Sequence, residues 1–197
     1  MTYKNVQKLV IDAYFPTLNI VRQIHLPLEK PRYENDAEHS FSLSLIGSAL
    51  AKKIGLNPGK VALYATYHDL LEIYSGDTSL WDKKGYETKI QREKDAIVRI
   101  KKDFNDFSLI LKNIHNYESF ADEEACFTYA LDKLLPLIIN IQDQCNFYHL
   151  NKITYEMHMA KVTEVRPKVS KHSEVLKWYD EAVEYARKNK EQIFYHE

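Results

Sequence analysis

Apolar side chains recur every three or four residues along most of this chain, and this helical spacing limits the fold more than any other feature of the sequence. Alternation with a period of two, the mark of a half-buried strand, is nearly absent, and only five glycines and six prolines interrupt 197 residues. We therefore predict an all-α fold and, at this length, a single domain that spans residues 1–197. Helices are expected at residues 4–14, 18–25, 36–54, 58–74, 87–103, 106–117, 121–150, 153–164 and 171–193.

The predicted helix 58–74 carries the most informative polar residues. Asn57 is a suitable N-cap and Pro58 suits the first helical position, so the stretch is expected to be one helix. Adjacent helical residues point about 100° apart, so His68 and Asp69 could both reach an ion that lies between their directions. Glu72, four residues after His68, is expected on the same face, where it could act as a general acid or base without being a ligand.

Each of these residues also has an ordinary interpretation. A histidine beside apolar residues on a helix is usually a hydrogen-bonded core residue, and an aspartate after it is usually solvated or part of a cap. Asp132 is more informative, because it lies in the apolar run 129–139 and a buried carboxylate needs a partner. The ordinary partner is Lys133 or a contact at a helix terminus, and the alternative is a metal ion.

Other local signals place the remaining polar residues. The helix 36–54 begins after Asn35, with Glu38 three residues on as in a capping box, so His39 lies in its first turns. Its broad apolar surface indicates a central helix. Asp77 follows a glycine and must lie in a turn or loop, from which an aspartate can reach into a site. Pro136, one turn after Asp132, predicts that its helix kinks or breaks there.

The order of these blocks resembles a known family. One histidine, an adjacent His-Asp pair and a later aspartate are the pattern of the HD-domain superfamily of metal-dependent phosphohydrolases. Within it, the blocks look most like the branch of the bacterial 5′-deoxynucleotidases of the YfbR type. The resemblance spans a motif core from about residue 21 to 141, and helices within 153–193 are expected to pack on it. The blocks that carry it are Glu34-Asn35-Asp36-Ala37-Glu38-His39-Ser40, His68-Asp69-Leu70-Leu71-Glu72, Gly76-Asp77 and Ala130-Leu131-Asp132-Lys133.

The resemblance implies one divalent metal ion with a catalytic site around it. The metal ligands it implies are His39, His68, Asp69 and Asp132. Two histidines and two carboxylates leave open coordination positions, so the ion could be Mn, Co, Fe, Ni or Mg, or Zn, although a closed tetrahedral zinc site fits less well.

The same resemblance implies roles for residues near the metal. Glu72 corresponds to a residue linked with proton transfer, and Asp77 to one that holds water or substrate. Arg22 matches an arginine that would bind the phosphate. The deoxynucleotidases follow that arginine with a tryptophan associated with sugar selection, whereas this chain has Gln23, so a weaker deoxyribose preference is expected.

Charge and composition narrow the possible partners. The formal net charge of −1 gives no overall basic field for nucleic acid or an acidic membrane surface. The N-terminus lacks the apolar stretch of a signal peptide, and no run is long enough to span a membrane, so a cytoplasmic protein is expected. Relatives in the family often dimerise, which makes a homodimer possible.

The predicted function is therefore that of an HD-domain phosphohydrolase, acting on a small phosphate monoester and most simply on a nucleoside 5′-monophosphate. One alternative is a phosphohydrolase for a nucleoside triphosphate or a cyclic nucleotide. Another is a non-catalytic nucleotide-binding helical module with a vestigial metal site. Glu72 distinguishes the last alternative, since a binding protein needs no acid or base beside the ion.

Overall fold

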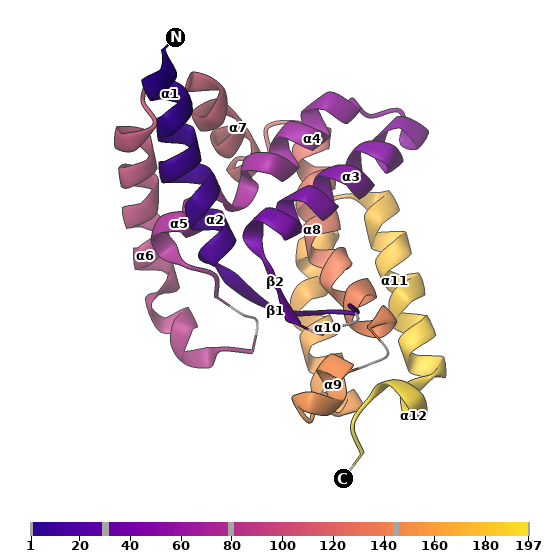
Figure 1. The fold of residues 1–197 in the computed structure, drawn as a ribbon. Coiled ribbons are helices and arrows are strands. Elements are labelled where there is room, and N and C mark those ends of the chain that lie inside the picture. The colour runs from indigo at the N-terminus through magenta and orange to yellow at the C-terminus, as the bar shows by residue number, and fades with distance from the viewer. Residues whose placement is uncertain (1, 29–31, 79–80, 144–145, 197) are drawn as a thin grey trace.

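The computed structural model describes residues 2–28, 32–78, 81–143 and 146–196, and it confirms the all-α prediction with one small addition (Figure 1). The addition is a two-stranded antiparallel sheet, β1–β2. No helix in the described ranges is long and apolar enough to cross a membrane. The elements are α1 Tyr3–Lys8, a π-helical turn Leu9–Tyr14, α2 Phe15–Asn19, β1 Val21–Leu26, β2 Arg32–Asn35, α3 Asp36–Ile54, α4 Pro58–Tyr67, a 3₁₀ turn His68–Leu71, α5 Glu72–Ser75, α6 Lys83–Asp103, α7 Ser108–Glu118, α8 Glu123–Gln142, α9 Asn146–Leu150, α10 Tyr155–Val169, α11 Ser173–Lys188 and α12 Lys190–Ile193.

Two large clusters of buried apolar side chains hold the helices together, beside a minor one formed by Tyr64, Tyr117 and Ala125. The larger cluster surrounds α8, which lies between the α3–α4 pair and the C-terminal helices α10 and α11 (Figure 1). The smaller cluster joins the 3₁₀ turn to α6 and α7, with side chains of the π-helical turn packed against it. Its buried members are Leu70, Leu71, Ala96, Ile100, Phe104, Ile110 and Ile114.

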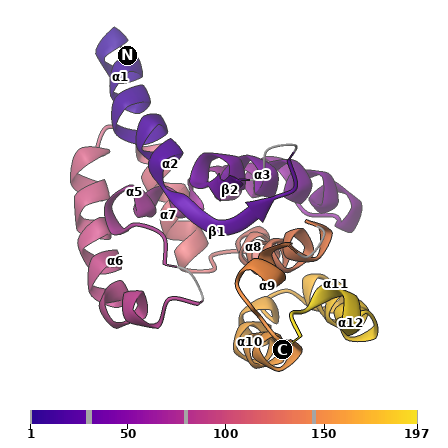
Figure 2. The same ribbon diagram turned by 60° about the horizontal axis from the view of Figure 1, so that its bottom comes forward.

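The predicted helix 18–25 is wrong, because α2 ends at Asn19 and the next residues form β1. The β-branched residues Val21 and Ile24 favour a strand, and β2 supplies the pairing partner, with Val21 opposite Asn35. Figure 2 shows β1 curving from α2 towards α9. Neighbouring side chains of a strand point to opposite faces, so Arg22 is half-buried while Gln23 is exposed.

The predicted single helix 58–74 is also corrected. Its start is confirmed, since the Asn57 side chain accepts hydrogen bonds from the N–H groups of Gly59 and Lys60. The helix then tightens into the 3₁₀ turn at His68 before α5 begins. Residues three apart eclipse one another in a 3₁₀ helix, so Glu72 follows Asp69 rather than sharing the face of His68.

Other boundaries differ less. The capping box at Asn35 and Glu38 is confirmed at the start of α3. Helix α8 continues through Pro136 without a break and ends at Gln142, so the predicted helix 121–150 is two helices, with residues 144–145 outside the described ranges. The predicted helix 4–14 is α1 followed by the π-helical turn, and 171–193 divides at Asn189. Helix α6 begins four residues before its predicted start, and α10 runs five residues past its predicted end.

Candidate metal centre and substrate pocket

Four predicted ligands come together from three parts of the chain. His39 lies in the first turn of α3, His68 and Asp69 form the start of the 3₁₀ turn, and Asp132 lies in the middle of α8. His39, His68 and Asp132 are at most 3% exposed. Their neighbours in sequence belong to both apolar clusters, so the site lies where the two clusters meet.

The ring nitrogens and carboxylate oxygens converge within a few ångströms. His39 Nε2 lies 2.8 Å from Asp132 Oδ1 and 3.7 Å from Asp69 Oδ2. His68 Nε2 lies 3.0 Å from Asp69 Oδ2 and 3.7 Å from Asp132 Oδ1. The ligand atoms of His39, His68 and Asp69 lie within 4.8 Å of one another, a spacing that could hold a metal ion.

Two observations show that the donor set fits a divalent cation. His68 Nδ1 lies 2.9 Å from the carbonyl oxygen of Ala65, to which it can donate, so the Nε2 lone pair can face the cluster. His68 Nε2 is buried and has no partner in hydrogen-bond geometry within the described structure. Imidazole nitrogen and carboxylate oxygen together suit a divalent transition metal or Mg.

Charge within the cluster also favours a cation. Burial opposes the protonated form of His68, but the Asp69 and Asp132 carboxylates prevail and raise its pKa to about 10. Burial likewise opposes ionisation of Asp69, yet His68 and Arg22 hold the pKa of Asp69 below its usual value. The pKa of Asp132 is lowered against burial by Lys133 and the two histidines. The cluster is therefore held together by positive charge, which a divalent ion can supply in place of a proton.

Arg22 reaches the cluster from β1. Its Nη1 donates to Asp69 Oδ2 at 2.8 Å, and it also lies near two further carboxylates, Nη1 3.7 Å from Asp36 and Nε 3.4 Å from Glu34. Burial disfavours the guanidinium charge, but Asp69 and Asp132 outweigh it and raise the pKa of Arg22. Within the described residues Nη2 of Arg22 donates no hydrogen bond, so it is available to a ligand.

Glu34 and Asp36 belong to the site, although the sequence pattern alone assigns them no role. Asp36 is 1% exposed, and neither of its carboxylate oxygens has a hydrogen-bond partner in the described structure. Glu34 Oε2 lies 3.5 Å from His39 Nδ1, the ring nitrogen that faces away from the cluster. In the sequence, the only indication of a role for these two residues is their place in the acidic block before His39. Their burial cannot be predicted from that block, because it depends on β2 and its pairing with β1.

Glu72 stands beside Asp69 and Asp36, with ligand atoms of the three carboxylates within 4.8 Å of one another. Burial, followed by the charges of Asp69 and Asp36, raises the pKa of Glu72 well above its usual value. Burial and Asp69 raise the pKa of Asp36 to about 7. Glu72 Oε2 is buried without a hydrogen-bond partner among the described residues, as expected of a group that can accept a proton.

A pocket of about 150 Å³ opens beside the cluster, and all predicted substrate residues line it. Asp77 reaches it from the loop after α5, where burial raises the pKa of its carboxyl group. Three lysines also line the pocket, and one of them, Lys133, lies 2.5 Å from Asp132 Oδ2, so the ordinary partner of Asp132 is present as well. The lining residues that matter here are Arg22, Gln23, Asp69, Glu72, Asp77, Trp81, Tyr86, Lys89, Asp132, Lys133 and Lys168.

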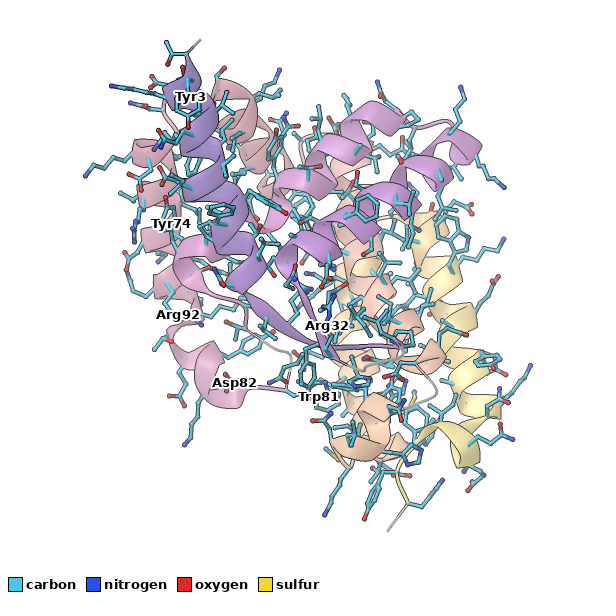
Figure 3. All side chains as sticks on the ribbon, in the orientation of Figure 1. Tyr3, Arg32, Tyr74, Trp81, Asp82 and Arg92 are labelled. Atoms are coloured by element: carbon cyan, nitrogen blue, oxygen red, sulfur yellow. The ribbon has the colours of Figure 1, made fainter. Side chains whose placement is uncertain are left out.

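Lys89, Lys168 and the aromatic residues have no role predicted from the sequence. Lys89 lies in a charged stretch that resembles any solvated helix, and Lys168 lies on a helix that was expected to end before it. Figure 3 shows Trp81 below the strands, between the α6 side and the α8–α10 side of the molecule. These residues meet only through tertiary packing, which no local pattern records.

Comparison with known proteins places this geometry in a family context. The HD domain family matches residues 19–174. A crystal structure of a predicted metal-dependent phosphohydrolase from Magnetospirillum magnetotacticum MS-1 superposes with a TM-score of 0.77 and 26% identity. That match covers 96% of this chain and 94% of the other chain.

Curated relatives match over shorter stretches. A 5′-deoxynucleotidase of Cronobacter sakazakii is 33% identical over 94 residues, which are 45% of this chain and 46% of the relative. The 5′-deoxynucleotidase YfbR of Salmonella paratyphi B is 37% identical over 75 residues, 35% of this chain and 37% of the relative. The matched stretches thus span less than half the length of these curated relatives.

Proposed function

The chain belongs to the HD-domain family, and we propose that it is a metal-dependent phosphohydrolase that releases phosphate from nucleoside 5′-monophosphates. The observation that carries the proposal is one pocket lined by Asp69 and Asp132 of the metal cluster, by Arg22, and by Glu72. Hydrolysis of a phosphate monoester requires a Lewis-acid site, a cation that binds the phosphate and a carboxyl group that can move a proton.

The proposed ligands are His39, His68, Asp69 and Asp132. A divalent ion held by them would polarise a phosphoryl oxygen and lower the pKa of a water molecule. The side chains of Arg22 and Lys133 lie beside the two carboxylate ligands, so their remaining donors can bind the other phosphoryl oxygens. These contacts would hold phosphorus in line with the attacking water.

Glu72 is proposed to move the proton. As the water oxygen bonds to phosphorus and the ester P–O bond breaks, the water proton passes to Glu72 Oε2, and a proton is returned to the leaving oxygen. Burial raises the pKa of Glu72 above the usual carboxyl value, which favours holding the proton until it is returned to the leaving oxygen. Asp77, on the loop after α5, also lines the pocket and is proposed to orient the water or the sugar.

The choice of substrate rests on the relatives and on one substitution. Both curated relatives described above are named 5′-deoxynucleotidases, which supports a nucleoside 5′-monophosphate. Gln23 is exposed and lines the pocket, where an amide can hydrogen-bond a hydroxyl group that a tryptophan would exclude. We therefore propose a weaker preference for deoxyribonucleotides than the tryptophan-bearing relatives have.

A substrate and metal screen tests the proposal. The protein is stripped with chelator and dialysed, then assayed with Mn, Co, Mg, Ni, Fe or Zn against matched nucleoside monophosphates, triphosphates and cyclic nucleotides, with products separated by chromatography. We expect nucleoside and phosphate from monophosphates only when a metal is added. Products from triphosphates or cyclic nucleotides alone would favour those substrates, and binding without turnover would favour a non-catalytic module.

A homodimer is part of the proposal. Exposed apolar side chains gather on the outer face of the N-terminal helices and α3, including Tyr14 at 54% exposure and Phe41 at 69%. Both residues line a hollow of about 440 Å³ on this face. Light scattering of the wild type and of Phe41→Asp should show a dimer that the substitution converts to monomer, whereas a monomeric wild type would remove this part of the proposal.

A further inference from the structure

One guanidinium group on α6 contacts the residues on both sides of Asp77. Arg92 Nη1 donates to the carbonyl oxygens of Ser75 and Gly76, the latter at 3.5 Å. Arg92 Nη2 donates to Thr78 Oγ1 at 2.7 Å and to the carbonyl oxygen of Gly85 at 3.1 Å. Both residues that flank Asp77 in sequence are therefore bound to the same side chain.

This arrangement differs from that of other arginines in the chain. No carboxylate of the described residues lies within ion-pair distance of Arg92, whereas Arg99 and Arg166 each pair with an aspartate. A charged fork whose donors go to backbone carbonyls and threonine hydroxyls, rather than to a carboxylate, serves to fix the course of a loop. Figure 3 shows Arg92 on α6, beside the end of α5.

The loop needs such a restraint. Gly76 has φ of 70° and ψ of 154°, a conformation that glycine adopts but other residues rarely do, and helix α5 ends immediately before it. Glycine loses more conformational freedom on ordering than any other residue, so an external contact has to keep this turn in place. The Arg92 contact also ties the loop to the first turn of α6 through Gly85.

We propose that Arg92 is a positioning residue that holds the Asp77 carboxylate at the pocket. The proposal rests on the proposed function, because Asp77 is expected to orient the substrate or water there. A displacement of about 1 Å at a group that positions substrate can lower turnover on the order of 100-fold. Loss of Arg92 should therefore act through Asp77 and leave the metal ligands unchanged.

A double-mutant cycle on the full chain tests this inference. We expect Arg92→Ala to lower kcat/KM roughly 10-fold to 100-fold. If Asp77→Asn lowers kcat, Arg92→Ala should also lower kcat, and if Asp77→Asn raises KM, Arg92→Ala should also raise KM. In the Asp77→Asn background, Arg92→Ala should add little, because the positioned group is already gone. Metal content should stay at the wild-type level, and Arg99→Ala on the same helix is the matched control. Guanidinium added to Arg92→Ala should restore part of the activity.

Hydrogen exchange provides a readout that does not depend on the substrate. Peptides that contain residues 75–78 should exchange faster in Arg92→Ala, while peptides with His39 or Asp132 should not. If Arg92→Ala does not fold, Arg92→Lys, which keeps the charge but loses the fork, takes its place. Losses that multiply in the double variant, or unchanged exchange at 75–78, would overturn the inference. An inactive wild type with faster loop exchange in the variant would instead count against the proposed function alone.

Discussion

The metal cluster and the rim of the pocket are built in different ways. The ligands His39, His68 and Asp132 project from helices whose apolar neighbours fill the two clusters, and they are almost fully buried. The rim residues Arg22 and Asp77 come from a short strand and a loop, and ion pairs with carboxylates rather than apolar packing hold the Arg22 side chain in place. Cluster geometry is therefore fixed by the core, whereas rim geometry depends on a few polar contacts.

Because the cluster and the rim are built differently, metal binding and substrate choice should depend on different residues. Metal binding and stability should depend on the helical side of the site, because moving a ligand there means disturbing the core. Substrate choice should depend on the rim, where a side chain can change without loss of the fold.

Removal of a helical ligand should have the largest effect. His68→Ala and Asp132→Ala should each lower metal affinity by more than the roughly 10–100-fold typical of residues that only support a ligand. Asp132→Ala should also destabilise the fold by about 3–5 kcal/mol, since it leaves the buried His39 side chain without its carboxylate partner. Metal analysis after dialysis and thermal denaturation measure the two effects. His158→Ala, at a buried histidine distant from the cluster in sequence, should keep its metal; wild-type metal in both ligand variants would place the ion elsewhere.

Loss of Glu72 should remove turnover while keeping the metal. Glu72→Gln is nearly isosteric and should lower kcat by about 10²–10⁴-fold, the usual contribution of acid–base catalysis. Burial raises the pKa of Glu72, so the acidic limb of the wild-type rate profile should lie above the usual carboxyl value of about 4.3, with activity falling as pH drops through it. That limb should vanish in Glu72→Gln. An active variant would exclude Glu72 from proton transfer, and a metal-free one would make it a ligand.

Arg22→Ala should weaken all phosphorylated substrates alike. The expected loss is roughly 1.5–3 kcal/mol in kcat/KM, the value of a charge-assisted hydrogen bond. Steady-state kinetics on several nucleoside monophosphates give the measurement, and Arg166→Ala, at an exposed ion pair with Asp180, is the control. A loss that depends strongly on the sugar or base would mean that Arg22 reads more than the phosphate.

Gln23→Trp should have the smallest effect, confined to the sugar. We expect the ratio of kcat/KM values for deoxyribo- and ribonucleotides to rise by about 1 kcal/mol, or roughly fivefold, with metal content and stability unchanged. Parallel kinetics on matched substrate pairs decide the outcome. A strong deoxyribose preference in the wild type that persists in Gln23→Ala would contradict the proposed role of this position.

The same contrast explains what the sequence predicts. Helices such as α3 and α8 follow from apolar spacing and caps, and the four candidate ligands stand out as polar residues in apolar surroundings. Strand β1 is predicted as a helix from the sequence, since six residues with mixed polar and apolar side chains contain too little periodicity to distinguish the two. Pairing with β2, a tertiary contact, decides it.

The rim shows the other limit of prediction. Asp36, Lys89 and Lys168 look like ordinary surface charges in sequence, yet they are buried or line the pocket because distant elements fold over them. The 3₁₀ turn that places Glu72 beside Asp69 carries no distinctive residue type. Such features depend on how helices pack, and a periodic pattern contains no information about them.

Pro136, which lines the pocket, gives helix α8 an additional property. A proline has no N–H, so the main-chain carbonyl of Asp132, four residues earlier in α8, has no helical donor. The residue proposed to bind metal through its side chain thus also carries a backbone oxygen without the usual donor four residues on, one turn from a proline that lines the same pocket. Helix α8 therefore lacks one backbone hydrogen bond at the turn that carries Asp132. Fewer backbone contacts restrain this turn than restrain the rest of the helix.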